Sequence, residues 1–167
     1  NRFPETAAEL FSYDAVILGS LEAAALSQDQ HNWLKEFVDR RGGSLLLLAG
    51  RDGLGDGGWS RVPLAQLLPA VLPAGAARSY GTRVSNVQPT EYGRESPIGR
   101  FDADPIKNAA QWKELPALAD YQDLGKLRPG AVVLIETVAA GGVTSPLLVT
   151  QRYGRGATYL LGTASTW

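Results

Sequence analysis

Two short apolar runs with a helical pattern between them constrain the fold of this chain more than any other sequence feature. The runs cover residues 13–19 and 44–50, and a glycine ends each of them. Uninterrupted apolarity of this length is typical of strands that are covered on both faces of a parallel sheet. Between the runs, large apolar side chains recur at helical spacing, at Trp33, Leu34, Phe37 and Val38.

The helix between the runs carries its own start and stop signals. Ser27 and Gln30 have the spacing of a capping box, which satisfies free backbone N–H groups at a helix start. Arg41 suits the negative end of the helix dipole, and Gly42 and Gly43 end the helix directly after it. Strand, capped helix and strand in this order predict a βαβ unit with a right-handed crossover.

The C-terminal third predicts an antiparallel meander. Three expected strands, joined by glycine-containing turns, cover residues 131–138, 146–153 and 157–162. The fold class is therefore α/β, with a parallel βαβ core and a C-terminal antiparallel meander.

The remaining segments carry weaker signals. One short helix is expected to begin at residues 3–6, and another is expected over residues 63–68. Residues 82–87 are rich in β-forming side chains. Residues 104–121 are expected to be mostly loop with one short helix.

Composition excludes several kinds of chemistry. The 167 residues suit a single domain spanning 1–167, and they contain no Cys and one His. This excludes disulfides, thiolate metal sites and cysteine nucleophiles, and no cofactor is expected. The formal net charge of -1 argues against nucleic acid as a partner. No apolar run reaches the roughly 18 residues that span a bilayer, so no membrane contact is expected from this segment.

Short stretches along nearly the whole chain follow an order that is typical of one known domain. They are residues 3–4, 14–19, 41–47, 57–59, 63–69, 112, 115–116, 146–149, 153–156 and 165–167. In these stretches the chain resembles the glutamine amidotransferase-like domain of large bacterial membrane-anchored proteins. The resemblance implies a three-layer α/β sandwich of the flavodoxin-like, class I amidotransferase-like type.

The resemblance also implies a setting for the chain. Because the sequence begins at Asn1 and contains no Met, we expect a piece of a longer protein, trimmed at both ends. The parent would be anchored in a bacterial cell envelope, on a side of the membrane that the sequence does not indicate. Partners would be other domains of the parent or envelope proteins. A missing strand would leave a sheet edge exposed, through which the chain could form a homo-oligomer.

The chemistry of class I amidotransferases does not carry over. Their cysteine lies on a strand-to-helix elbow, which the resemblance places at residues 50–53, and a histidine and a glutamate follow a late strand, near residues 163–165. None of the three residues is present at these places. Without a thiol and its base there is no triad. We therefore expect a module without catalysis that serves protein interaction or ligand sensing.

A binding site that survives in such a fold is expected at the carboxyl ends of the parallel strands. The candidate ligand-binding residues there are Gly19, Ser20, Gly50, Arg51, Asp52, Gly53 and Trp59. Arg51 with the loop amides could capture an anion. An alternative hypothesis is a hydrolase of different chemistry, in which Glu22, Asp52 or Asp56 holds a divalent metal.

Structural interpretations stand beside these functional ones. Asp52 and Asp56 are more simply explained as caps of backbone amides in a glycine-rich loop. Trp59, Trp112 and Trp167 are expected to cover edges of the core, and His31 is expected on a solvated helix face because its sequence neighbours are polar.

Overall fold

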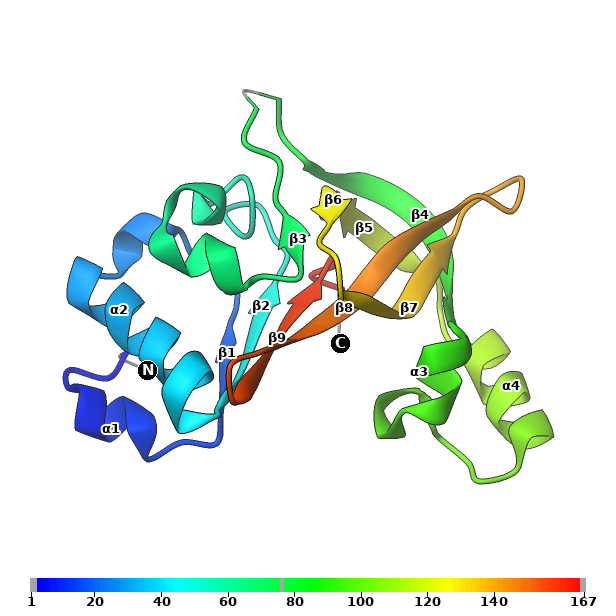
Figure 1. Ribbon diagram of the computed structural model, residues 1–167. Coiled ribbons are helices and arrows are strands. Elements are labelled where there is room, and N and C mark those ends of the chain that lie inside the picture. Colours follow the sequence, from blue (N-terminus) through cyan, green and yellow to red (C-terminus); the bar gives the residue numbers. More distant parts are fainter. Residues whose placement is uncertain (1–2, 76, 166–167) are drawn as a thin grey trace.

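The computed structural model describes residues 3–75 and 77–165, which form one mixed sheet of seven strands and a small sheet of two. The large sheet has the order β1-β2-β9-β8-β7-β4-β5 (Figure 1). Its strands are β1 (Ala15–Leu18), β2 (Ser44–Leu48), β9 (Gly156–Leu161), β8 (Thr144–Tyr153), β7 (Val132–Val138), β4 (Tyr80–Pro89) and β5 (Leu118–Gln122). The small sheet pairs β3 (Ala70–Val71) with β6 (Lys126–Leu127).

The predicted βαβ unit is confirmed. β1 and β2 are parallel neighbours, with Ala15 opposite Ser44, and β2 pairs in parallel with β9 on its other side. The crossover helix α2 (Gln28–Glu36) begins with the predicted capping box at Ser27. It continues as a π-helical turn, η2 (Phe37–Arg41), which ends at Gly42 with a φ of 89°. Both signals act locally, so the sequence places the two helix ends correctly.

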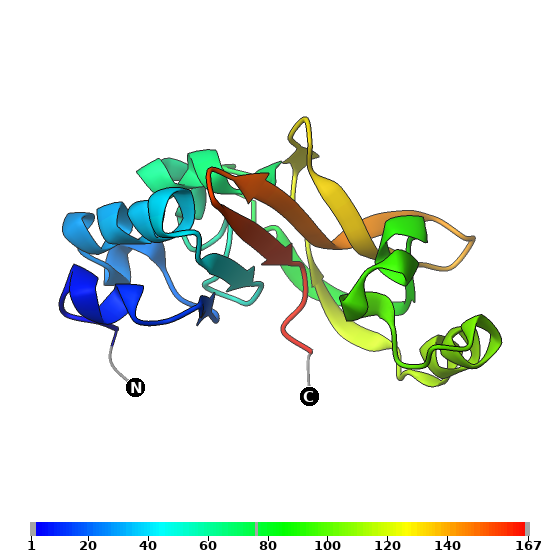
Figure 2. The same ribbon diagram turned by 60° about the horizontal axis from the view of Figure 1, so that its bottom comes forward.

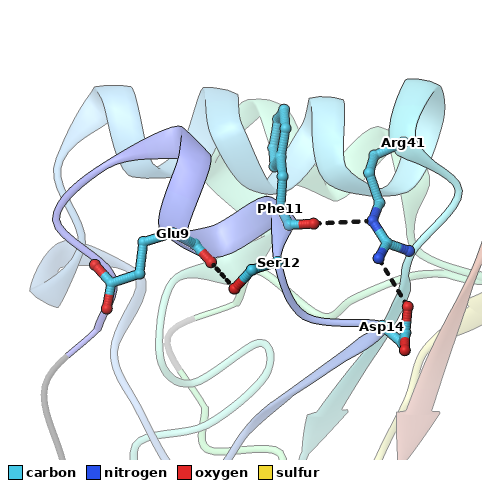
Figure 3. Close-up of polar contacts among 5 residues, drawn as sticks. All are labelled: Glu9, Phe11, Ser12, Asp14 and Arg41. Atoms are coloured by element: carbon cyan, nitrogen blue, oxygen red, sulfur yellow. Dashed lines mark hydrogen bonds and ion pairs between the residues drawn. The ribbon is translucent and has the colours of Figure 1, made fainter.

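Arg41 joins the end of this crossover to the start of β1. Its Nε donates to the carbonyl oxygen of Phe11 at 3.1 Å, and its Nη2 lies 2.7 Å from Oδ1 of Asp14 (Figure 3). Phe11 ends the short helix α1 (Ala7–Phe11), whose predicted start near residues 3–6 is confirmed by Thr6 as N-cap. In the same view, Ser12 Oγ donates to the carbonyl of Glu9 at 2.7 Å. The connection between α1 and β1 is therefore fastened to both neighbouring helices.

The expectation that β1 is covered on both faces is wrong. β1 is the outer strand of the sheet, and Ile17 is 64% exposed. In β2, Leu45 and Leu47 are buried in the core, while Leu46 and Leu48 are only half-buried. The helical layer of α1, α2 and η2 packs on one face, so one side of each strand carries most of the core (Figure 2).

The C-terminal meander is confirmed, with β7, β8 and β9 pairing in sequence. Within residues 104–121 the expected short helix is confirmed, but the expectation that the rest is mostly loop with no strand is wrong. Ten of these residues form the helix α4 (Pro105–Glu114), which Asp104 caps by accepting from two backbone N–H groups. The following β5 then pairs with β4. Pro105 suits the first turn of α4, because that position needs no backbone donor.

A second group of helices lies at the far end of the sheet from α1 and α2 (Figure 1 and Figure 2). It consists of α3 (Glu91–Glu95), the 3-10 turn η5 (Pro97–Gly99) and α4. Three further 3-10 turns lie near the parallel strands: η1 (Ala23–Ala25), η3 (Trp59–Arg61) and η4 (Pro63–Leu67). Of these, η4 confirms the short helix expected from residue 63.

Candidate functional site

The loops that follow β1 and β2 meet at the carboxyl edge of the sheet, as the sequence predicted. Ser20 Oγ accepts a hydrogen bond from the backbone N–H of Asp52 at 3.2 Å. A Cβ on Gly50 would overlap the Ser20 side chain, so glycine is needed there for the close approach. The structure therefore brings Ser20, Gly50 and Asp52 together, with the side chains of Arg51 and Asp52 exposed at the loop tip.

Gln122, at the end of β5, hydrogen-bonds to the loop that follows β2. Its Oε1 accepts from the N–H of Gly50 at 3.1 Å, and its Nε2 donates to the carbonyl of Gly53 at 3.0 Å and to Ser79 Oγ at 3.1 Å. The side chain is completely buried. Sequence reasoning missed Gln122, because a single glutamine 72 residues from its partner carries no local signal. The predicted elbow is thus braced by an amide of the same chain.

Asp56 acts as a cap, as its structural interpretation predicted, but for a distant segment. Its carboxylate accepts from the N–H of Ser79 at 2.9 Å, from Ser79 Oγ at 2.8 Å and from the N–H of Tyr80 at 3.0 Å. Burial alone would raise the pKa of Asp56, but these hydrogen bonds and the nearby Arg78 hold it below its ordinary value. Asp56 therefore stays ionised and fully engaged, which makes it a poor nucleophile.

A second carboxylate, Asp120 of β5, lies where the resemblance expected the histidine and glutamate. Thr163 Oγ1 and the Ala164 N–H each donate to its Oδ1 at 2.8 Å, and Ser165 Oγ donates to its Oδ2. The Tyr80 side chain is a further hydrogen-bond partner. Burial would raise the pKa of Asp120, but these donors outweigh it and lower the pKa below the ordinary value. Asp120 thus fixes the segment after β9, and no sequence pattern pointed to it.

Trp59 and His31 lie in the core. Trp59 is 1% exposed, and its indole Nε1 donates to the carbonyl of Leu21 at 2.7 Å. The His31 ring stands edge-on to it, with centroids 5.6 Å apart. The expectation that His31 is solvated is wrong: it is 4% exposed, and its Nε2 lies 2.9 Å from the Ala23 carbonyl. Since a carbonyl only accepts, Nε2 carries the proton.

The polar neighbours of His31 misled the prediction, because burial follows helical spacing rather than sequence adjacency. Leu34 and Val38 continue the same buried side of the helix toward the core. Trp112 is buried and donates to the Gly99 carbonyl at 2.9 Å, which agrees with its expected structural role. Trp167 lies outside the described residues.

The loop carboxylates give the metal hypothesis no support. Within residues 3–75 and 77–165, no three His, Asp or Glu side chains lie close enough together to hold a metal ion.

In the same part of the chain, no helix is long and apolar enough to cross a bilayer. Arg51 is exposed at the loop tip, where its carbonyl accepts from Arg78 at 3.4 Å.

A groove of about 1090 Å³ lies away from the predicted site, at the second helical group, where the end of β4, α3 and α4 bound it. A smaller hollow of about 540 Å³ lies against β8, β9 and Pro129. None of the seven candidate ligand-binding residues lines either hollow.

Comparison with solved structures identifies the fold. The chain superposes on the cytoplasmic protein STM3548 from Salmonella typhimurium with a TM-score of 0.74 at 19% identity, covering 97% of this chain and 65% of that one. The cytoplasmic protein STM1381 from Salmonella typhimurium LT2 gives 0.67 at 20% identity, with the same coverage. A cold-adapted β-galactosidase from Rahnella sp. R3 gives 0.57 at 15% identity, over 92% of this chain and 20% of that one.

These likenesses extend over almost the whole of this chain, whereas the chain spans 65% of the length of each of the two Salmonella proteins. No protein-family model matches the sequence, and no curated protein matches it. These likenesses show the fold alone: an α/β fold with a mixed sheet that has a parallel core and antiparallel C-terminal strands.

Proposed function

We propose that this chain is a non-catalytic module with a class I amidotransferase-like fold, which acts by binding a protein or a ligand. The fold supports the proposal, because it is the scaffold on which amidotransferases build a thiol site. The composition supports it too, because the chain contains no cysteine. A class I glutaminase mechanism is therefore absent whatever else the chain does.

The observation that carries the proposal is the state of the carboxyl edge. A catalytic site needs a nucleophile or base whose reactive atom faces substrate. Here Gln122 is bonded to Gly50 and Gly53, while Asp120 is bonded to the segment after β9. The buried polar side chains at this edge already serve the fold, and the exposed Arg51 and Asp52 are left to bind a ligand.

A direct assay of glutamine hydrolysis tests this proposal. The purified chain is incubated with glutamine, and ammonia is measured with a glutamate dehydrogenase coupled reaction beside an active class I amidotransferase. We expect no ammonia above the buffer blank. Ammonia release proportional to protein concentration would overturn the proposal.

The setting of the module stays a prediction. An anchored parent in the bacterial envelope, with envelope proteins or neighbouring domains as partners, is what the sequence resemblance implies. The two Salmonella structures are described as cytoplasmic proteins, which gives that part of the prediction no support. Self-association through a sheet edge has a candidate in β1, the outer strand with the exposed Ile17. Sedimentation of the wild-type chain and an I17K variant would test that edge.

A further inference from the structure

The groove at the second helical group, called here the β4–α4 groove, has the size of a binding site. Its volume of about 1090 Å³ is slightly above the roughly 300–1,000 Å³ of ordinary ligand sites. Val87 and Pro89 of β4 form part of its lining, and Ala109 and Trp112 of α4 line it from the other side. Leu115, just after α4, adds a further apolar side chain that is 38% exposed.

The α4 wall of the groove is held in place by buried hydrogen bonds. Asn108 Nδ2 and Trp112 Nε1 both donate to the carbonyl of Gly99, at 3.1 and 2.9 Å. Asn108 Oδ1 also accepts from the N–H of Phe101 at 2.8 Å, and the Phe101 ring lies 4.8 Å from that of Trp112. Both donors are buried, so the groove exists before any partner binds.

β4 is left without a strand partner on the side that faces α4. β5 pairs with β4 only as far as Ser85, opposite Leu118, within the described part of the chain. The chain that leads into β5 contains Pro116, which has no N–H to extend the ladder. β4 itself continues to Pro89 and pairs with β7 on its other side. An open strand edge therefore borders the groove.

The backbone groups of Val87 point to this open edge. The N–H of Thr90 donates to the Leu134 carbonyl of β7 at 3.0 Å, so alternation along the strand directs Gln88 to β7 and Val87 away from it. The carbonyl of Pro89 confirms the alternation, because it accepts from Arg94 Nη1 at 3.1 Å on the side away from β7. Such an edge can pair with one more extended strand.

The rim of the groove carries charges of both signs that form no ion pairs with one another. The lining includes Arg94, Arg100, Lys113, Glu91, Glu95, Asp102 and Glu136. Within residues 3–75 and 77–165, the ion pairs that the structure shows are at Arg40 and Arg41, in the other half of the fold. An apolar centre with such a rim matches the anatomy of a protein interface. A small ligand that carries charge of one sign would be repelled by the rim residues of the same sign.

We propose that the β4–α4 groove binds an extended peptide segment of a partner protein, which adds a strand beside Val87. Apolar side chains of the segment lie over Val87, Ala109 and Leu115, and its flanking residues of mixed charge meet the rim. This inference rests on the proposed binding function and moves its site from the carboxyl edge to the opposite end of the fold.

Ala109 and Ala110 offer a matched pair of variants for the test. Both are exposed on α4, but only Ala109 lines the groove. Random linear peptides displayed on phage are selected against the wild-type chain, and the enriched peptides are synthesised. We expect A110R to bind them like the wild type and A109R to bind at least about tenfold more weakly. A109E, with the opposite charge, separates blocking of the groove from charge repulsion.

Nuclear magnetic resonance provides the readout for strand addition. We expect hydrogen exchange of the Val87 amide to slow when a selected peptide binds. Equal peptide binding by A109R and wild type, an unprotected Val87 amide, or the failure of every library to yield a peptide would each overturn the groove proposal. A wild-type dimer that A109R dissociates would name a second copy as the occupant, and would overturn it too. The glutamine assay reads the proposed function independently of all these outcomes.

Discussion

Replacement of Gln122 by alanine should destabilise the fold far more than an ordinary glutamine substitution. The change leaves the buried N–H of Gly50 without an acceptor, which costs about 1–3 kcal/mol, and deprives the Gly53 carbonyl of a donor, for roughly 1 kcal/mol more. The vacated space adds about 1 kcal/mol. The total of about 3–5 kcal/mol compares with the 5–15 kcal/mol that keeps a typical domain folded.

Urea unfolding of Q122A, Q122L and Q66A measures this effect. Q122L fills the space and should recover only the cavity part, because the orphaned backbone groups remain. Gln66 is exposed, so Q66A should stay within about 0.5 kcal/mol of the wild type. For a chain of this size, Q122A should melt roughly 6–20 °C lower. A loss below about 1 kcal/mol, or one equal to that of Q66A, would refute the idea that Gln122 braces the loop.

Three other perturbations test separate parts of the structure. Because the pKa of Asp120 is lowered in the folded state, this carboxylate stabilises the fold at pH values above its ordinary pKa of 3.8. That stability is lost as the pH falls through the folded-state pKa. D120N should therefore reduce the free energy of unfolding at pH 7 and weaken its decline in acid, measured by unfolding at a series of pH values. An unchanged acid slope would contradict this. G93A should cost about 1–3 kcal/mol, because its Cβ would overlap a carbonyl of β7, whereas Gly81 has open space and G81A should be neutral in thermal melts. S27A should lose about 1 kcal/mol and S27G a few tenths, by chemical unfolding; equal losses would argue against the cap.

The parts of the fold that the sequence predicts are those with local causes. The capping box at Ser27, the stop at Gly42 and the turns of the meander each depend on residues a few positions apart. Such signals survive any tertiary arrangement, and the structure confirms them. Apolar content alone was a poorer guide, because it does not show how many faces of a strand are covered by helices. The helical layer of α1, α2 and η2 packs on one face, so Ile17 of β1 is exposed on the other face, and Leu46 and Leu48 of the interior strand β2 are only half-buried.

The site was harder to predict than the fold. Proximity of the loops at Ser20 and Gly50 follows from parallel pairing, and the sequence placed them correctly. The residues that these loops contact lie on β5, a strand about 70 residues further along the chain that joins the sheet by antiparallel pairing with β4. Gln122 and Asp120 therefore carried no signal that a reader of the sequence could weigh. The groove was also hidden, because the sequence predicted a short helix within residues 104–121 but gave no sign that it packs beside the end of β4.

The distribution of internal hydrogen bonds favours the β4–α4 groove over the carboxyl edge as the proposed binding site. At the carboxyl edge, Asp56, Asp120 and Gln122 have partners within the chain, so a ligand that used these side chains would have to break hydrogen bonds. At the β4–α4 groove, the open strand edge can gain backbone hydrogen bonds, and the rim charges can gain ion pairs, because they form none with one another. Binding is favoured where it leaves internal hydrogen bonds in place, since breaking one leaves a buried donor or acceptor unsatisfied, at a cost of about 1–3 kcal/mol. Under the proposed function, the carboxyl edge contributes stability to the fold, and the β4–α4 groove is the surface that recognises a partner.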